Sequence, residues 1–235
     1  MKKTFFCFLK KYALLALFLL PANALFSNNK TIDSLLNVLK TTKEDTNKVN
    51  VLWRLSQQYI DTDPGEAEKH IKDATELSKK LNYDSGLAFA YYFTGVIQSD
   101  KGSFQSALLF LHDALYLANK INNKRLLARI YNEMGSINKR LGNYKNALEH
   151  YYQSLKVAEI FGDTVSIAAA SGNIGDLSSK LGNYKEAIKY LQKDIDLIEK
   201  TKNPNATPYM NLGIVYQTIE NSEKALEYYN KAIEI

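Results

Sequence analysis

The sequence predicts an all-α fold, a solenoid of stacked antiparallel helix pairs, on three observations. A seven-residue motif that ends in alanine recurs every 40 residues, at Lys101–Ala107, Leu141–Ala147 and Leu181–Ala187, and returns after 38 residues at Ile219–Ala225. Twelve residues before each of these marker alanines stands a glycine: Gly95, Gly135, Gly175 and Gly213. Within each period, apolar residues recur at three- and four-residue steps, the period of an amphipathic helix. Two markers in one phase indicate an internal repeat.

Residues 1–24 have the layout of a secretory signal peptide. A basic start with four lysines and no acidic residue contains or adjoins the apolar run Tyr12–Leu20, and Pro21 precedes the small-residue triplet Ala22–Ala24. Signal peptidase accepts small side chains at the first and third places of such a triplet, so we expect cleavage after Ala24. An uncleaved membrane anchor is the alternative, but a spanning helix needs about 20 apolar residues. The leader predicts export, to the periplasm or the medium.

The charge of the chain argues against a nucleic-acid partner. The formal net charge is +5, but residues 1–24 carry four positive charges and no negative one. The remainder has 26 basic and 25 acidic residues, which predicts no basic face for phosphate contacts. The single cysteine, Cys7, lies in the leader. The mature chain therefore has no thiol for a disulfide, a metal site or a nucleophile.

The repeat sets the boundaries after the leader. Residues 25–45 are expected to form an N-terminal segment, with residues 25–30 loose and residues 31–40 a short lid helix. Residues 46–235 form the array, with repeats one to five at about 46–83, 84–123, 124–163, 164–203 and 204–235, the last one incomplete. Each repeat is predicted to hold a helix A and a helix B, separated by a turn such as Gly142-Asn143, because glycine readily adopts the left-handed conformation that ends a helix. Thr207 is predicted as an N-cap and Pro208 as the first helical residue.

The repeat glycines need a packing reason, because glycine in a helix interior costs about 1 kcal/mol relative to alanine. We expect each glycine to let helix A approach helix B closely, with the glycine against the marker alanine. Large residues stand four places after the marker alanine: Ile71, Leu111, Tyr151, Leu191 and Tyr229. Small residues stand seven places after it, at Ala74, Ala114 and Ala232, and Ser154 and Asp194 take this position in repeats three and four.

This pattern resembles the tetratricopeptide repeat (TPR) family over residues 46–235. The family's small residue of helix A falls on the four glycines, and its Gly-Asn-aromatic turn falls on Gly142–Tyr144 and Gly182–Tyr184. The first repeat departs most, with Leu55 in the place of the glycine. The resemblance implies a right-handed superhelical solenoid of antiparallel helix pairs. Its period exceeds the family's usual length of about 34 residues, and this long-repeat type resembles the exported sensor half of bacterial TPR-containing signalling proteins.

No fragment of the sequence predicts catalysis, a cofactor or a metal site, so the chain is predicted not to be an enzyme. Asp61–Glu66 opens like a calcium loop, but Gly65 stands where a ligand is needed, and we interpret the segment as a turn. Asp194 and Asp196 are predicted to lie on the wet face of their helix. Zinc needs three or four convergent ligands, so the histidines, one in each of three repeats, are predicted to be solvated: His70, His112 and His150.

The exposed positions of the A helices are the predicted partner contacts, since in the TPR family these helices line the concave face. Carried over by phase, the candidates are Tyr92, Phe93, Val96, Arg129, Asn132, Glu133, Asn173, Asp176, Met210, Asn211 and Ile214. Their neighbours on this face are Phe89, Asp100, Ser136, Lys139, Arg140, Ala169, Ser179, Lys180 and Gln217.

Asparagine at one place of helix A has a specific interpretation. Asn173 and Asn211 stand two residues before the repeat glycine, where related long repeats hold the main chain of an extended peptide, and an amide both donates and accepts hydrogen bonds. The alternative is that asparagine is merely tolerated there. Phe93 and Glu133 occupy places that the carboxylate clamp of chaperone-binding arrays needs for other residues, which argues against a chaperone adaptor.

Two functions stay open from the sequence. The first is an exported scaffold that binds another protein or a peptide. The second is the extracytoplasmic sensor portion of a larger signal-transduction protein, a histidine kinase or a transcription regulator, with a membrane span beyond Ile235. An enzyme, the third class, lacks a supporting constellation of residues.

The last helix is predicted to expose an apolar face. In repeats two and three, helix B runs about fourteen residues past its marker alanine, whereas ten residues follow Ala225. Solenoids normally end in a polar capping element. We therefore expect either a longer protein or self-association of two copies through the last helix.

Overall fold

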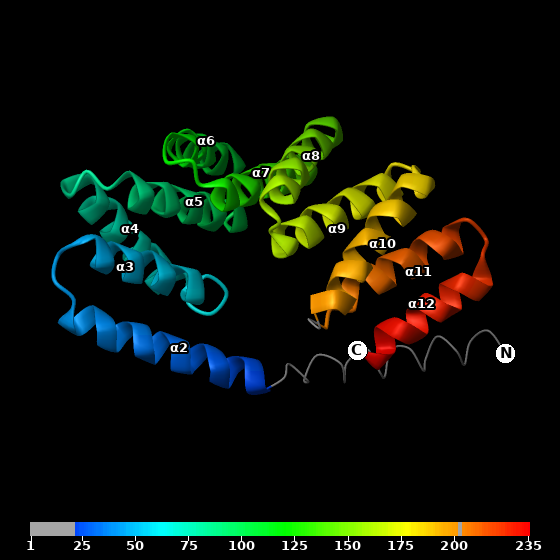
Figure 1. Ribbon diagram of the computed structural model, residues 1–235, viewed down its shortest axis with the longest axis horizontal. Coiled ribbons are helices and arrows are strands. Elements are labelled where there is room, and N and C mark those ends of the chain that lie inside the picture. The colour runs from blue at the N-terminus through cyan, green and yellow to red at the C-terminus, as the bar shows by residue number, and fades with distance from the viewer. Residues whose placement is uncertain (1–21, 202–203) are drawn as a thin grey trace. The chain divides into compact units, whose positions relative to one another are not determined.

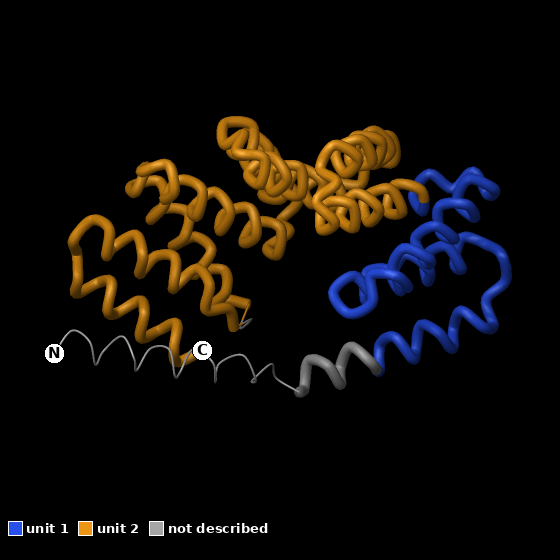
Figure 2. The backbone as a smooth tube through the Cα atoms, turned by 180° about the vertical axis from the view of Figure 1, so that it is seen from behind, with its two compact units in different colours: residues 1–86 blue, residues 87–235 orange. Residues whose placement is uncertain are grey.

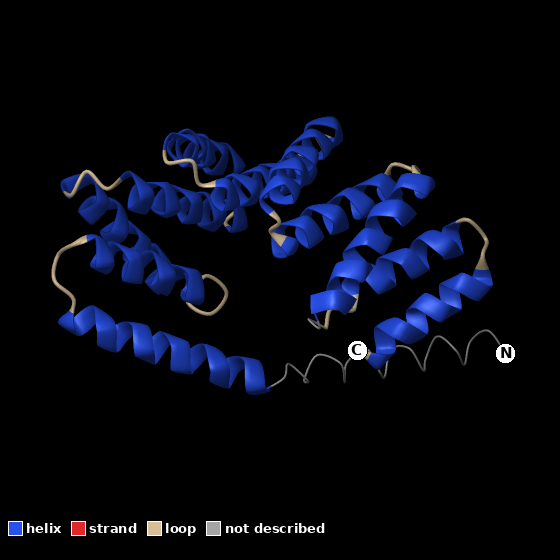
Figure 3. Ribbon diagram, in the orientation of Figure 1, coloured by secondary structure: helices blue, strands red, loops and turns tan. Residues whose placement is uncertain are grey.

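The computed structural model describes residues 22–201 and 204–235, with side chains from residue 30 onward, and within these ranges it contains helices and no strands (Figure 3). The predicted all-α class is confirmed. The signal-peptide prediction falls mostly on residues 1–21, which lie outside the described residues. The first described helix begins at Ala22 and therefore includes the predicted cleavage position.

The helices follow one another along the chain with short turns (Figure 1). They are α2 (Ala22–Thr41), α3 (Thr46–Tyr59), α4 (Pro64–Lys80), α5 (Asp84–Asp100), α6 (Phe104–Lys120), α7 (Lys124–Arg140), α8 (Tyr144–Phe161), α9 (Thr164–Lys180), α10 (Tyr184–Thr201), α11 (Thr207–Thr218) and α12 (Ser222–Glu234). After α2 they form five consecutive pairs, in which α3, α5, α7, α9 and α11 are the A helices. Gly142 has φ of 77°, the left-handed conformation predicted for the turn between α7 and α8.

One predicted helix start differs by a residue. Thr207 is the first residue of α11, and Ala206 occupies the N-cap position. The main-chain N–H of Thr207 donates to Asn205 Oδ1 at 3.0 Å. The asparagine thus supplies the side-chain acceptor that we had expected from the threonine, and Pro208 still lies in the first turn, where its missing N–H costs nothing.

The chain forms two compact units, residues 1–86 and residues 87–235 (Figure 2). In the first unit α2 packs on α3, where Ile32 is buried together with Val51 and Leu55. The lid helix is therefore present, but it begins earlier than predicted. Residues 25–30 are helical rather than loose, since no proline or glycine interrupts the sequence from Ala22 to Thr41.

The core of the second unit lies between successive helices. One cluster joins α5, α6 and α7 around Leu111 and Met134, a second joins α8 and α9 around Tyr151, and a third joins α10, α11 and α12 around Leu191 and Leu212. Each cluster draws residues from neighbouring helices in the sequence. The burial of apolar area that stabilises the fold is thus local along the chain, as expected for a solenoid.

The repeat glycines make the close helix contact that the sequence predicts, but with another partner. A Cβ atom on Gly135 would lie 2.6 Å from Tyr151 Cδ1, and one on Gly213 would lie 2.6 Å from Tyr229 Cδ1. Gly95 and Gly175 meet leucine side chains in the same way. The glycine therefore faces the large residue four places after the marker alanine, not the alanine itself, because only a residue without a side chain leaves room for that ring or leucine.

The last helix exposes apolar residues whose counterparts are buried. Ile233 of α12 is 81% exposed, whereas Leu155 and Ile195, at the same position in repeats three and four, are 5% and 2% exposed. In those repeats the next A helix packs alongside, with contacts between α8 and α9 and between α10 and α11. Self-association through α12 stays a prediction.

Candidate partner-binding face

The exposed sides of α5, α7, α9 and α11 make up one surface of the second compact unit, which we call the A-helix face. The contacts of α9 with both α7 and α11 place these three A helices next to one another. Their inward sides are fixed by the glycine contacts, so the residues of the opposite sides are left to face solvent or one another. These residues are the candidate contacts predicted from the repeat phase.

Two side-chain pairs join α7 to α9 on this face. Asn173 Nδ2 donates a hydrogen bond to Asn132 Oδ1 at 2.9 Å. Lys139 Nζ forms an ion pair with the Asp176 carboxylate. Each asparagine is half-buried and keeps further donor or acceptor capacity, since an amide offers two N–H groups and an oxygen with two lone pairs. The pairs hold the amides in place while leaving part of each one unused.

The α5–α7 part of the face is more enclosed. Arg140 of α7 pairs with Asp100 at 3.7 Å and donates to the Ser99 carbonyl at 3.1 Å. Burial raises the pKa of Glu133, and the nearby Asp100 raises it further. Burial also raises the pKa of Tyr92 to about 12, with a smaller contribution from Glu133. This carboxylate and phenol are thus only partly hydrated.

The repeat phase selects accessible side chains with one exception. Met210 and Ile214 are 51% and 47% exposed. Half-buried candidates are Tyr92, Val96, Arg129, Asn132, Glu133, Asn173, Asp176 and Asn211. Phe93 is only 4% exposed, so its prediction as a surface contact is wrong. An apolar ring at this place gains more from burial than an amide does, and the Phe93 ring packs edge-on against Tyr92 with centroids 5.0 Å apart.

The α11 end of the face differs from the α7–α9 part. Asn211 is half-buried, and no hydrogen bond of its side chain is found among the described residues. Met210 and Ile214 flank it one and three residues away and give the end of the face an apolar character. This part of the face therefore presents a polar amide between two exposed apolar side chains.

Sequence reasoning misplaced Asp194 of α10. It was predicted on the wet face, yet it is 7% exposed, and burial raises the pKa of its carboxyl group to about 6. The repeat phase contained the signal, because Asp194 stands seven residues after the marker alanine, where other repeats carry alanine or Ser154. In repeat three the Ser154 hydroxyl donates to the Ala128 carbonyl at 2.7 Å, which satisfies the buried polar group.

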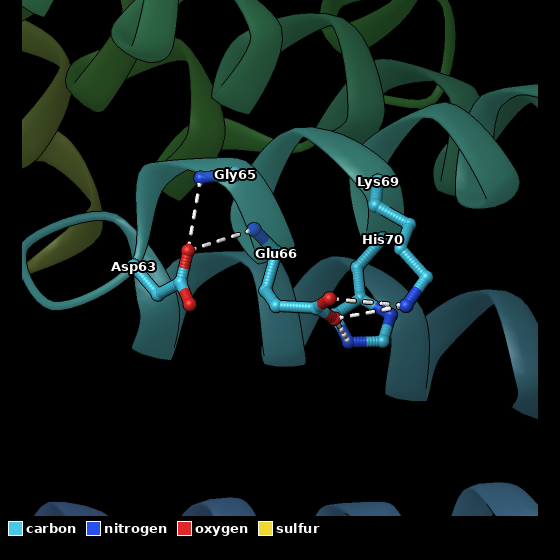
Figure 4. A network of polar contacts seen from close by, with 5 residues as sticks. All are labelled: Asp63, Gly65, Glu66, Lys69 and His70. Atoms are coloured by element: carbon cyan, nitrogen blue, oxygen red, sulfur yellow. Dashed lines mark hydrogen bonds and ion pairs between the residues drawn. The ribbon is translucent and has the colours of Figure 1, made fainter.

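His70 was also predicted to be solvated, and it is buried at 5% exposure. Its ring stacks on Tyr59 with centroids 5.7 Å apart, and Nε2 lies 3.5 Å from Glu66 Oε2 (Figure 4). Burial lowers the pKa of His70, so this ring is held neutral by its apolar surroundings. The predicted turn before it is confirmed, since Asp63 Oδ1 accepts from the N–H groups of Gly65 and Glu66, each at 3.1 Å, and caps α4.

Two negative findings apply to residues 22–201 and 204–235. No three His, Cys, Asp or Glu side chains in these ranges come close enough to hold a metal ion. None of the helices in the same ranges combines the length and hydropathy that crossing a membrane requires.

Comparison with known families identifies the repeat. A tetratricopeptide repeat model matches residues 126–200 and residues 166–235. Residues 126–235 thus carry the family's sequence pattern, and the helix pairs before them have the same architecture. The chain is a tetratricopeptide repeat protein. This fold is typically a non-catalytic scaffold for protein interactions. No curated protein matches the sequence of the chain.

Solved structures with the same fold have little sequence in common with the chain. BtubC (BKLC) from P. vanneervenii is 17% identical with a TM-score of 0.70, and the match covers 88% of this chain and 87% of that one. A signal transduction ATPase with numerous domains from Pyrococcus horikoshii, described as having a tetratricopeptide repeat sensor, is 20% identical with a TM-score of 0.71, over 88% of this chain and 33% of that one. Aspartyl phosphate phosphatase F from Bacillus subtilis is 15% identical with a TM-score of 0.67, over 89% and 68%.

Proposed function

We propose that the chain is a scaffold that binds a protein or peptide through the A-helix face. The observation that carries this proposal is the division of labour in each helix pair. The glycine side of helix A is consumed by packing, whereas the other side carries half-buried amides and charges and, at Met210 and Ile214, exposed apolar side chains. Amides suit the main chain of a peptide, and apolar anchors beside them suit its side chains.

The test is site-specific crosslinking in the native cell. A photoreactive residue in place of Met210, on the A-helix face, should capture a discrete partner. The same residue in place of Lys156, an exposed position of helix α8, is the matched control and should not. Capture only from position 156, or equal capture from both, would place the binding surface elsewhere.

A second candidate is the sensor portion of a larger signalling protein. The likeness to a signal transduction ATPase that is described as carrying a tetratricopeptide repeat sensor favours it, and there the match covers 33% of the other chain. The gene sequence beyond Ile235 is the decisive observation. A membrane span followed by a kinase or DNA-binding domain would establish the sensor, and a stop codon would leave the scaffold alone.

The proposed scaffold acts outside the cytoplasm. This proposal is supported by the leader, in which a basic start, an apolar run and the triplet Ala22–Ala24 follow one another. N-terminal sequencing of exported protein should then begin at Leu25. An intact Met1 in an exporting cell would argue for a membrane anchor instead.

A further inference from the structure

Asp194 is a buried carboxylate that lacks a partner. Its side chain is 7% exposed, and among the described residues no hydrogen bond or ion pair reaches it. Burying an unpaired charge is costly, and most buried polar groups in folded proteins find a partner. The fold does not require a charge at this place, because repeats one, two and five have alanine there and repeat three has Ser154. The carboxylate therefore needs a reason other than stability.

The carboxylate is directed at Gly172 of α9. A Cβ atom on Gly172 would lie 2.7 Å from Asp194 Oδ2, so the oxygen occupies the space into which a side chain at position 172 would extend. Gly172 is partly exposed. Beside it, the Oγ atom of Ser171 is buried without a hydrogen-bond partner among the described residues. Two unsatisfied buried oxygens thus lie at one point of α9.

The repeat shows which surface position 172 belongs to. Forty residues earlier the same place is Asn132, whose side chain reaches Asn173 on the A-helix face. The counterpart of Asn173 in repeat five is Asn211, 38 residues later. Where α7 and α9 are joined by two amides, α9 therefore presents a glycine with a carboxylate behind it, and the amide of Asn211 has no partner among the described residues.

We propose that Ser171, Gly172, Asp194 and Asn211, which we call the Asp194 site, bind one arginine or lysine side chain of a partner that lies along the A-helix face. A cation supplies the missing counter-charge together with several N–H donors, and charge-assisted hydrogen bonds are stronger than neutral ones. The missing side chain at Gly172 gives the cation access to the carboxylate from this face. The inference rests on the proposed function and names the chemistry of one segment of its partner.

The surroundings define the neighbour of that basic residue. Met210 and Ile214 stand beside Asn211 and are 51% and 47% exposed. An apolar side chain adjacent to the basic one can cover them, as apolar anchors do in peptide grooves. The recognised segment is therefore a basic residue next to an apolar one.

The test uses acetyl-Leu-Arg-amide as the probe and acetyl-Leu-citrulline-amide, its uncharged isostere, as the control ligand. With the full chain labelled for NMR, the arginine probe should shift the main-chain amide of Gly172 and the side-chain amide of Asn211. The citrulline ligand should bind about tenfold more weakly or less, as the loss of one charge-assisted contact implies. Asp194→Asn should abolish the preference for arginine.

A second variant guards against a purely structural effect. Gly172→Asn combined with Asp194→Ala places at the α9–α11 junction the residues that repeat three has or tolerates, and it should fold while losing the response to the arginine probe. Equal binding of both ligands, arginine binding that survives Asp194→Asn, or no shift at Gly172 at millimolar probe would each overturn the inference. Crosslinking of a partner from position 210 in the Asp194→Asn protein would then show that the proposed scaffold function stands without it.

Discussion

The junction between α7 and α9 and the junction between α9 and α11 occupy the same place in successive repeats, yet they differ in how their polar groups are satisfied. At the first, Asn173 bonds to Asn132 at 2.9 Å and Ser154 of helix B bonds to the Ala128 carbonyl at 2.7 Å. At the second, the corresponding residues of α9 and α10 are Gly172 and Asp194, and the carboxylate lies buried against the glycine.

The difference separates what the repeat needs from what one site adds. Both junctions keep the glycine contact, with Gly135 against Tyr151 and Gly175 against Leu191. They diverge only in the polar residues, where the first is closed by neutral hydrogen bonds and the second holds an unpaired charge. In a repeat protein, one copy therefore serves as the internal control for another.

The largest expected effect comes from breaking the contact that both junctions share. Gly135→Leu places side-chain atoms where a Cβ alone would already lie 2.6 Å from Tyr151. Overpacking of this kind costs about 1–3 kcal/mol and can exceed that range where helices cross closely. Urea unfolding should show a loss of about 3 kcal/mol. Ala169→Leu, at an exposed position of α9, is the control and should stay within about 0.5 kcal/mol. A fully stable Gly135→Leu protein would contradict the packing role.

The second prediction removes the charge that distinguishes the two junctions. Burial raises the pKa of Asp194 from 3.8 to about 6, so the folded protein holds a proton that the unfolded chain has released between these values. Stability therefore falls as the pH rises through this window, by about 3 kcal/mol. Of the neighbouring titratable groups, Tyr209 interacts with this carboxylate, and burial raises the pKa of Tyr209 to about 12, so it stays neutral throughout.

Asp194→Asn should lack this loss. Its stability relative to the natural protein should be higher by about 3 kcal/mol near pH 7 than near pH 4, measured by urea unfolding at each pH. Asp196→Asn, at an exposed position of the same helix, is the control and should change stability by less than about 0.5 kcal/mol. A stability difference that stays constant with pH would show that the Asp194 carboxyl is not desolvated.

The third prediction concerns the satisfied counterpart. Ser154→Ala removes a buried hydrogen bond to the Ala128 carbonyl but gives repeat three the alanine that repeats one, two and five already carry. The expected cost is about 1 kcal/mol, the typical net contribution of one hydrogen bond. Thermal unfolding of the variant should show it. An increase in stability would mean that the hydroxyl is strained rather than satisfied.

The sequence predicted the helix pairs, their turns and most of the accessible A-helix positions, because these follow from periodicity and from glycine at fixed phases. It failed where one side chain departs from the phase rule. Asp194 was assigned by its charge to solvent, although its place seven residues after the marker alanine indicated burial. Phe93 was assigned by its phase to the surface, although an aromatic ring there gains from turning inward. Both errors arise from ranking one rule above another where tertiary packing decides.

The smallest effect, and the most direct comparison of the two junctions, is that of their asparagines. Asn173→Ala breaks the hydrogen bond to Asn132 and leaves that half-buried amide unpaired, which should cost about 0.5–1 kcal/mol. Asn211→Ala breaks no bond among the described residues and should change stability by less than about 0.5 kcal/mol. Both variants should weaken capture of the partner by crosslinking, because each removes an amide from the A-helix face. Equal stability losses would show that Asn211 has a structural partner, and unchanged capture in both variants would remove the asparagines from the binding surface. If only Asn211→Ala reduces capture, the α7–α9 pair is a structural clamp and the partner is held at the α9–α11 junction.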